Sequence, residues 1–335
     1  MTAGYRVLAG AATCLAFVVV VVGAYVRLSD AGLGCPDWPG CYGQITPDHA
    51  RAEIDAAVQA QGGEHGPVSV HKAWKEMAHR YLAGMLGLAI LALTLLAWHQ
   101  RAQIARSPTL ATALLVLVIF QAALGMWTVT LLLKPVIVTL HLLGGMATLA
   151  LLAWLTVREK SRVPVMQDAA RARRLRPWAA LGLVIVVVQI ALGGWVSSNY
   201  AALACVDFPT CHGAWVPQMD FRQGFQLVRE LGRTADGGHL RYEALTAIHW
   251  THRAGALVTF VYVGALALAV IRSGLAWLGA ALAVVLALQV ALGIANVLAG
   301  LPLPIAVAHN AVAAVLLVTM VMINFALSRA TPKFS

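Results

Sequence analysis

The sequence predicts an all-α integral membrane protein, with eight transmembrane helices arranged as two four-helix bundles related by a pseudo-two-fold axis. The composition is the first reason, because 60% of the residues are hydrophobic and only 11% are charged, whereas about a quarter of the residues of a soluble domain are charged. The second reason is that the apolar residues form long uninterrupted runs. The third is that the two halves of the chain share motifs at nearly constant spacing.

Eight apolar runs are long enough to cross the hydrocarbon core of a bilayer, which takes about 20 residues in a helix. They cover residues 7–27, 77–98, 110–131, 136–157, 177–198, 247–271, 275–297 and 304–327. The first run has no small-residue cleavage site after it, so we expect a retained helix and not a signal peptide.

Basic residues indicate the orientation of these helices. Seven Lys and Arg side chains lie in residues 158–176, and such clusters mark the cytoplasmic side of a membrane protein. Both termini are then cytoplasmic, and the long loops 28–75 and 199–244 are periplasmic, across the inner membrane. The net charge of +10 comes largely from these short basic segments, so we expect contact with membrane lipid and none with nucleic acid.

An internal repeat divides the chain into two units of four helices. Residues 35–43 and 205–213 both have the pattern C-x-D-aromatic-P-x-C-x-G. An even number of helices lets both units insert the same way up, so we expect the symmetry axis to run along the membrane normal. The expected parts are an N-terminal unit (1–160), a basic cytoplasmic linker (161–176) and a C-terminal unit (177–328).

Four histidines fall in the first turns of the second, fourth, sixth and eighth spans: His79, His141, His252 and His309. These four spans run from the outside inward, so the histidines lie at similar depth. The third and seventh spans carry the motif Q-x-A-L-G at 121–125 and 289–293, and each glutamine precedes a histidine by twenty residues. One ionisable side chain in a span is a functional candidate or a helix-packing contact. The paired arrangement of four favours a shared function.

Two facing imidazoles in a four-helix bundle suit a haem iron that takes one axial ligand from each side. Zinc or copper needs three or four converging ligands, and each unit offers two. Arg80 and Arg253 directly follow two of the histidines, where they either bind haem propionates or extend toward lipid headgroups. The residues therefore predict a membrane redox protein with two haems.

Two cysteine pairs lie in the outer loops: Cys35 with Cys41, and Cys205 with Cys211. Disulfides persist on that side of the membrane, and the six-residue spacing with a proline turn allows one bridge within each loop. Such bridges are either structural or exchange electrons with external thiols.

The two units differ at one position close to a histidine. Three residues before His79 the first unit has Glu76, whereas the second unit has His249 at the equivalent position. The spacing places Glu76 on the same helix face as His79, and a carboxyl group in partly apolar surroundings suits general acid–base chemistry. The alternative for Glu76 is an ion pair with Lys72 or Lys75.

Together these motifs resemble the haem A synthase family, the bacterial and mitochondrial membrane enzymes that convert haem O to haem A. The matching features are the two C-x5-C loops, E-x-x-H-R at 76–80, H-R at 252–253, and the histidines at 141 and 309. The resemblance covers about residues 5–327, and the stretch 27–44 is closest to proteobacterial members.

The resemblance implies that His79 and His141 bind the iron of the substrate haem O, and that His252 and His309 bind a haem b cofactor. A ring methyl of haem O would become a formyl group by successive hydroxylations and loss of water, with electrons leaving through haem b. Glu76 matches a glutamate needed for activity. The pair Cys35–Cys41 matches a disulfide that aids activity, whereas the second pair is absent from some members.

The same resemblance implies a haem O synthase (protohaem farnesyltransferase) as supplier, cytochrome oxidase assembly as recipient, and an unidentified electron-transfer partner. The main alternative is a quinone-linked electron carrier with two equivalent b-type haems. A quinone-linked thiol oxidase would need a C-x-x-C pair, and a transporter would need broken helices at mid-membrane. The difference between Glu76 and His249 favours the synthase.

Overall fold

The computed structural model describes residues 3–63, 65–101, 107–159, 166 and 168–329, and over these residues it contains helices but no strands. The long helices are α1 (Ala3–Leu28), α3 (Val70–His99), α4 (Thr109–Thr130), α5 (Pro135–Glu159), α6 (Ala169–Ser198), α8 (Tyr242–Arg272), α9 (Ala276–Leu298) and α10 (Leu303–Ser328). All eight are long and apolar enough to cross a membrane. The predicted all-α membrane fold with eight spanning helices is confirmed.

Several helices begin earlier than the apolar runs predicted. Helix α3 begins at Val70 because the Ser69 hydroxyl accepts the backbone N–H of Lys72 at 3.2 Å. Helix α6 begins at Ala169, where the Asp168 carboxylate accepts the N–H of Arg171 at 3.0 Å. Hydropathy marks only the part of a helix that suits the hydrocarbon core, whereas polar N-caps decide where the helix starts.

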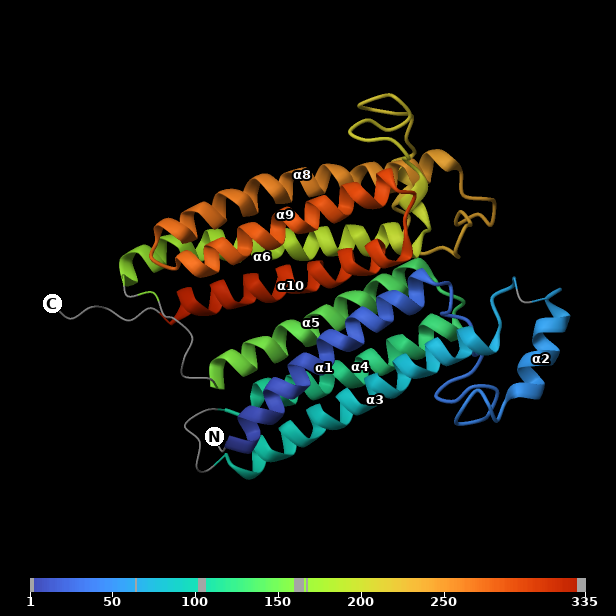
Figure 1. Cartoon of the computed structure of the whole chain (residues 1–335), viewed down its shortest axis with the longest axis horizontal. Coiled ribbons are helices and arrows are strands. Elements are labelled where there is room, and N and C mark those ends of the chain that lie inside the picture. The colour runs from blue at the N-terminus through green and yellow to red at the C-terminus, as the bar shows by residue number, and fades with distance from the viewer. Residues whose placement is uncertain (1–2, 64, 102–106, 160–165, 167, 330–335) are drawn as a thin grey trace.

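The eight long helices form two groups of four (Figure 1). Helices α1, α3, α4 and α5 contact one another in the first group, and α6, α8, α9 and α10 do so in the second. Helices α5 and α10 face each other across the boundary, and α5–α6 and α1–α10 contacts also join the groups. Helix α10 is the most central span, because 56% of its apolar window is buried against 17% for α1.

The backbone repeats itself at the outer ends of α1 and α6. Asp30 and Tyr200 both have positive φ, at 50° and 54°, and so do Tyr42 and His212, at 52° and 54°. Each pair is related by the offset that relates Cys35 to Cys205. These matches accord with the predicted pseudo-two-fold axis, which stays a prediction.

The long loops lie at the end of the molecule opposite the start of α1 and the end of α10 (Figure 1). In the first loop α2 (Arg51–Ala60) buries Ile54 in a cluster with Met77 and the cysteines of residues 35 and 41. The second loop contains the short elements η1 (Ala201–Leu203) and α7 (Phe221–Gly224). The indole N–H of Trp195 donates to the Gly224 carbonyl at 2.9 Å, which attaches this loop to α6.

Candidate functional site

Each outer cysteine pair forms a disulfide within its own loop. The S–S distance is 2.08 Å for Cys35–Cys41 and 2.07 Å for Cys205–Cys211. All four cysteines are buried. The bridges predicted from the six-residue spacing are confirmed, and a redox role for them stays a prediction.

An aspartate organises each disulfide loop. Asp37 accepts the backbone N–H groups five and six residues further on, at 2.6 and 2.7 Å, and Asp207 does the same at 2.7 and 3.0 Å. The Thr210 hydroxyl also donates to Asp207, and this bond together with the backbone N–H groups holds the pKa of that carboxyl well below its usual range. Gly43 and Gly213 end the motif with φ of 74° and 72°, a conformation that favours glycine.

Glu76 attaches the first loop to α3. One carboxylate oxygen accepts the backbone N–H of Cys35 at 3.0 Å, and the other accepts Nη2 of Arg80 at 2.5 Å. The Nη1 group of Arg80 then reaches back to loop carbonyls, that of Asp37 at 2.8 Å and that of Gly40. Glu76, Arg80 and the disulfide loop therefore form one hydrogen-bonded unit.

The lysines expected as alternative partners of Glu76 bond elsewhere. Lys72 donates to the carbonyl of Gly66 at 2.9 Å, and the Lys75 ammonium lies 5.0 Å from the centre of the Tyr25 ring. The ion pair of Glu76 is made with Arg80, one turn further along α3.

The second unit builds the same attachment with an imidazole. Nδ1 of His249 accepts the backbone N–H of Cys205 at 3.3 Å, and its Nε2 lies 3.3 Å from Nε of Arg253. Arg253 donates to the carbonyls of Asp207 and Thr210, both at 2.8 Å. Both arginines thus hold loop carbonyls, and the propionate contacts predicted for them stay predictions.

Glu76 and His249 are structurally equivalent and both buried, with 5% and 4% of their surface exposed. Each accepts the N–H of the first loop cysteine. Since an imidazole performs this attachment in the second unit, the fold does not require a carboxylate in the first. A catalytic role for Glu76 stays a prediction.

His79 and His141 face each other inside the first group of helices. Their ring centres are 6.5 Å apart and the ring planes are inclined by 83°. Two imidazoles that bind one metal ion from opposite sides, each with a metal–nitrogen bond of about 2.0–2.1 Å, have ring centres roughly 6 Å apart. The observed separation is compatible with one metal ion between the two rings, and the assignment of both histidines as haem ligands stays a prediction. The Nδ1 atom of each ring is buried without a hydrogen-bond partner.

Both histidines line a cavity of about 1440 Å³ between α1, α3, α4 and α5, and Glu76 lines it too. Small-molecule pockets usually measure about 300–1,000 Å³, so this cavity suits a larger ligand. Three of its apolar lining residues have large exposed fractions: Met85 (58%), Leu88 (68%) and Ile119 (63%). On the other side it reaches the second group of helices at Gly194, Ser197 and Asn310.

A glycine on the preceding long helix lies against each histidine ring. The pairs, with the distance from a Cβ placed on the glycine to the histidine Cε1, are Gly23–His79 (2.8 Å), Gly125–His141 (3.3 Å), Gly193–His252 (3.1 Å) and Gly293–His309 (3.1 Å). A methyl group at these positions would occupy space that the ring now uses. The glycines therefore set how deeply each imidazole can sit.

Glutamines also contact the histidines of the second unit. Nε2 of Gln189 lies 3.0 Å from Nδ1 of His252 and donates to the carbonyl of the same residue at 3.0 Å. Nε2 of Gln289 lies 3.2 Å from Nε2 of His309. These amides restrict the orientation of both rings, as hydrogen-bond partners of metal-binding histidines do.

The sequence prediction missed one of these residues. The motif Q-x-A-L-G was recognised at 121–125 and 289–293, but it also occurs at 189–193. Gln121 donates to the carbonyl of His141 at 2.8 Å. The fourth equivalent position, four residues before Gly23, is Val19, so His79 is the histidine without such a glutamine. A search of all four helices for this motif would have found Gln189.

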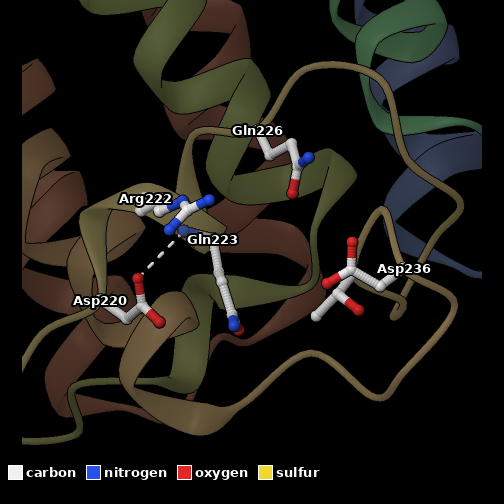
Figure 2. Close-up of a pocket in the computed structure, with 6 residues that line it drawn as sticks. Asp220, Arg222, Gln223, Gln226 and Asp236 are labelled. Carbon is white, nitrogen blue, oxygen red and sulfur yellow. Dashed lines mark hydrogen bonds between the residues drawn. The ribbon is translucent and has the colours of Figure 1, made fainter.

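A second, smaller cavity lies in the outer loop of the second unit (Figure 2). It measures about 280 Å³ and is lined by polar side chains. These are Asp220, Arg222, Gln223, Gln226, Thr234 and Asp236. Asp220 caps the N-terminus of α7, where its carboxylate accepts the backbone N–H of Gln223 at 3.0 Å. None of the four span histidines lines this cavity.

Among the residues that the structure describes, no group of three or more His, Cys, Asp or Glu side chains is arranged to hold a bare metal ion. The histidines come in pairs, which suits an iron already held by a macrocycle. In the second unit Nδ1 of His309 and Oε1 of Gln289 are buried without partners, and the His252 ring packs against Gly193. Binding of a haem by His252 and His309 stays a prediction.

The fold and the site together define a multi-pass membrane protein with a pair of intramembrane histidines in each half. The chain belongs to the COX15-CtaA family, described as cytochrome oxidase assembly protein, whose model matches residues 6–321. The resemblance predicted from the motifs is therefore confirmed over nearly the whole chain.

Three relatives, each named haem A synthase, illustrate the range of similarity. The protein of Shewanella oneidensis, a proteobacterium, is 44% identical over 92% of both chains. The protein of Methylobacterium radiotolerans is 30% identical over 94% of this chain and 87% of its own. The protein of Halalkalibacterium halodurans is 26% identical over 96% of both chains.

Proposed function

We propose that this chain is a haem A synthase, which oxidises one ring methyl of haem O to a formyl group and so makes haem A for terminal oxidases. Family membership and the relatives of that name support the activity. The structural observation that carries the proposal is the large cavity in which two facing histidines and one buried carboxylate meet.

In this proposal the N-terminal unit binds the substrate. His79 and His141 hold the iron of haem O, since their ring separation of 6.5 Å suits two axial ligands. The apolar part of the cavity, which Met85, Leu88 and Ile119 line, accommodates the farnesyl tail of haem O.

Glu76 is the proposed acid–base residue. It lies one helical turn before His79 and lines the same cavity. Each oxidation of the methyl group releases protons, and a carboxylate beside the ring can accept them. Arg80 and the Cys35 N–H orient this carboxylate through both of its oxygens, which is the preorganisation that proton transfer needs.

The C-terminal unit holds a haem b cofactor through His252 and His309, as proposed from the pairing of histidines. When bound, this group supplies one-electron transfer away from the substrate site. Gln189 and Gln289 keep its ligands in place. Asn310, the neighbour of His309, lines the substrate cavity, so the two sites adjoin.

We place the protein in the inner membrane, with both termini cytoplasmic and the cysteine loops periplasmic, from the seven Lys and Arg residues in 158–176. A haem O synthase is the proposed supplier. Cytochrome oxidase assembly is the process that the product serves, in line with the family description.

Co-expression with a haem O-forming farnesyltransferase, followed by chromatography of the extracted haems, tests the function. We expect haem A with the wild-type chain. Glu76→Gln should accumulate haem O or a hydroxylated intermediate, whereas the control Glu53→Gln, on the outer helix α2, should make haem A normally. A two-haem electron carrier would yield no haem A in any of these strains, and that result would overturn the proposal.

A further inference from the structure

Arg27 is the cation of the substrate cavity that still has hydrogen-bonding capacity. Two cationic side chains, Arg27 and Arg80, line the cavity among the described residues. Arg80 donates from Nη1 to loop carbonyls and from Nη2 to the Glu76 carboxylate. Nε of Arg27 is buried without an acceptor, and its side chain is only 14% exposed.

The remaining contacts of Arg27 position its guanidinium group. Nη2 donates to the carbonyl of Ser197 at 2.7 Å, and the group lies 4.0 Å from the centre of the Tyr200 ring. Nη1 forms an ion pair with Asp30 at 3.7 Å, which is longer than a hydrogen bond, and the Tyr200 hydroxyl donates to Asp30 at 2.9 Å. A guanidinium has five N–H donors, so these contacts leave most of them without a good acceptor.

We infer that Arg27 binds a propionate carboxylate of the haem substrate. Arginine presents parallel N–H groups that match a carboxylate, and such charge-assisted pairs are strong where water is excluded. Most of the cavity lining is apolar, so a buried propionate needs a cationic partner there. This role rests on the proposed function, because it presumes that a haem enters this cavity.

The second unit has no arginine at the position equivalent to Arg27. Eight residues before Cys35 the first unit has Arg27, and eight residues before Cys205 the second unit has Ser197. The two equivalent positions contact each other, through the bond from Arg27 to the Ser197 carbonyl. Arg27 therefore fixes the orientation of the substrate from a place where the two units meet.

Equilibrium binding of haem O and of its dimethyl ester, which lacks the carboxylate charges, tests this role. The titrations use purified full-length protein whose C-terminal unit is already loaded, and follow the difference absorption of the added haem. We expect wild-type protein to bind haem O about tenfold or more tightly than the ester, the scale of one charge-assisted pair. In Arg27→Gln this preference should disappear, because affinity for haem O falls to that for the ester.

Two further variants separate this role from a structural one. Arg27→Lys keeps the positive charge but loses the parallel N–H groups of the guanidinium, so it should keep part of the preference for haem O over its ester. Arg6→Gln, an exposed arginine on the same helix, should behave as wild type. The haem absorption of the C-terminal unit reports whether each variant is folded. If Arg27→Gln is folded and still prefers haem O over its ester, the inference is wrong.

The outcomes for Arg27 and for the function are distinct. A wild-type chain that makes haem A, paired with an Arg27→Gln variant that keeps the preference, refutes the role of Arg27 alone. A chain that shows the preference, and loses it in Arg27→Gln, but makes no haem A refutes the synthase function and leaves the carboxylate site standing.

Discussion

Replacing Gly23 with alanine tests how closely the fold positions His79. A Cβ at this position would lie 2.8 Å from Cε1 of His79, whereas an ordinary carbon–carbon contact is about 3.5 Å or longer, so the ring must recede by about 0.7 Å. Binding groups have to stay within about 0.5 Å of their productive positions. We therefore expect the affinity of the N-terminal unit for haem to fall about tenfold, or ~1.4 kcal/mol.

Two other glycines provide controls for this change. At Gly125 the new Cβ would lie 3.3 Å from His141, so the ring needs to move by only about 0.2 Å and affinity should fall little. At Gly10, on the same helix as Gly23, nothing lies within 4 Å of the new Cβ. Alanine there should leave binding unchanged and favour the helix by about 0.5–1 kcal/mol.

Titration of the three purified variants with haem O, followed by the absorption of the bound haem, measures this series. The expected order of affinity is Gly10→Ala equal to wild type, Gly125→Ala slightly lower and Gly23→Ala lowest. Equal affinities for Gly23→Ala and Gly10→Ala would refute the packing argument, since the first crowds a histidine ring and the second crowds nothing.

Three further predictions concern the second unit. His309→Ala should abolish the haem b absorption of the purified protein, and an unchanged spectrum would contradict its assignment as a ligand. Gln189→Val, which copies the residue at the equivalent place on α1, should speed the loss of haem b to apomyoglobin several-fold, because His252 loses its amide partner; an unchanged transfer rate would show that the amide does not hold the ring. The pKa of Asp207 is lower in the folded protein than the ordinary aspartate pKa of about 3.9. The ionised carboxylate therefore stabilises the loop at every pH above that ordinary pKa, and this stabilisation is lost only as the pH falls through the lower pKa of the folded state. Hydrogen exchange of residues 205–214 should therefore stay slow from pH 7 to 5 in wild type and be faster throughout in Asp207→Asn, and equal rates in the two proteins would contradict this.

Hydropathy and the repeat predicted the fold class well, because both depend on residue types at fixed spacing. Eight apolar runs became eight long helices, and the even helix count led to two groups of four. The helix starts were less accurate, since Ser69 and Asp168 extend α3 and α6 into polar sequence that a membrane scale ignores. Local capping interactions decide these boundaries.

Part of the site was visible in the sequence, and part depends on tertiary structure. The pairing of His79 with His141 follows from the position of each in its span. The reach of Arg80 to the carbonyl of Asp37 joins residues 43 apart, and that of Arg27 to Ser197 joins residues 170 apart. No spacing rule predicts such contacts, because they arise only when a loop folds back or two units meet.

The absorption spectrum of the protein, purified after expression with ample haem supply, tests the central claim most directly. The claim is that two histidines in each half bind a haem iron from opposite sides. We expect a low-spin spectrum of bis-histidine haem, and no such spectrum in a variant that lacks both His252 and His141. A colourless wild-type protein would contradict the claim.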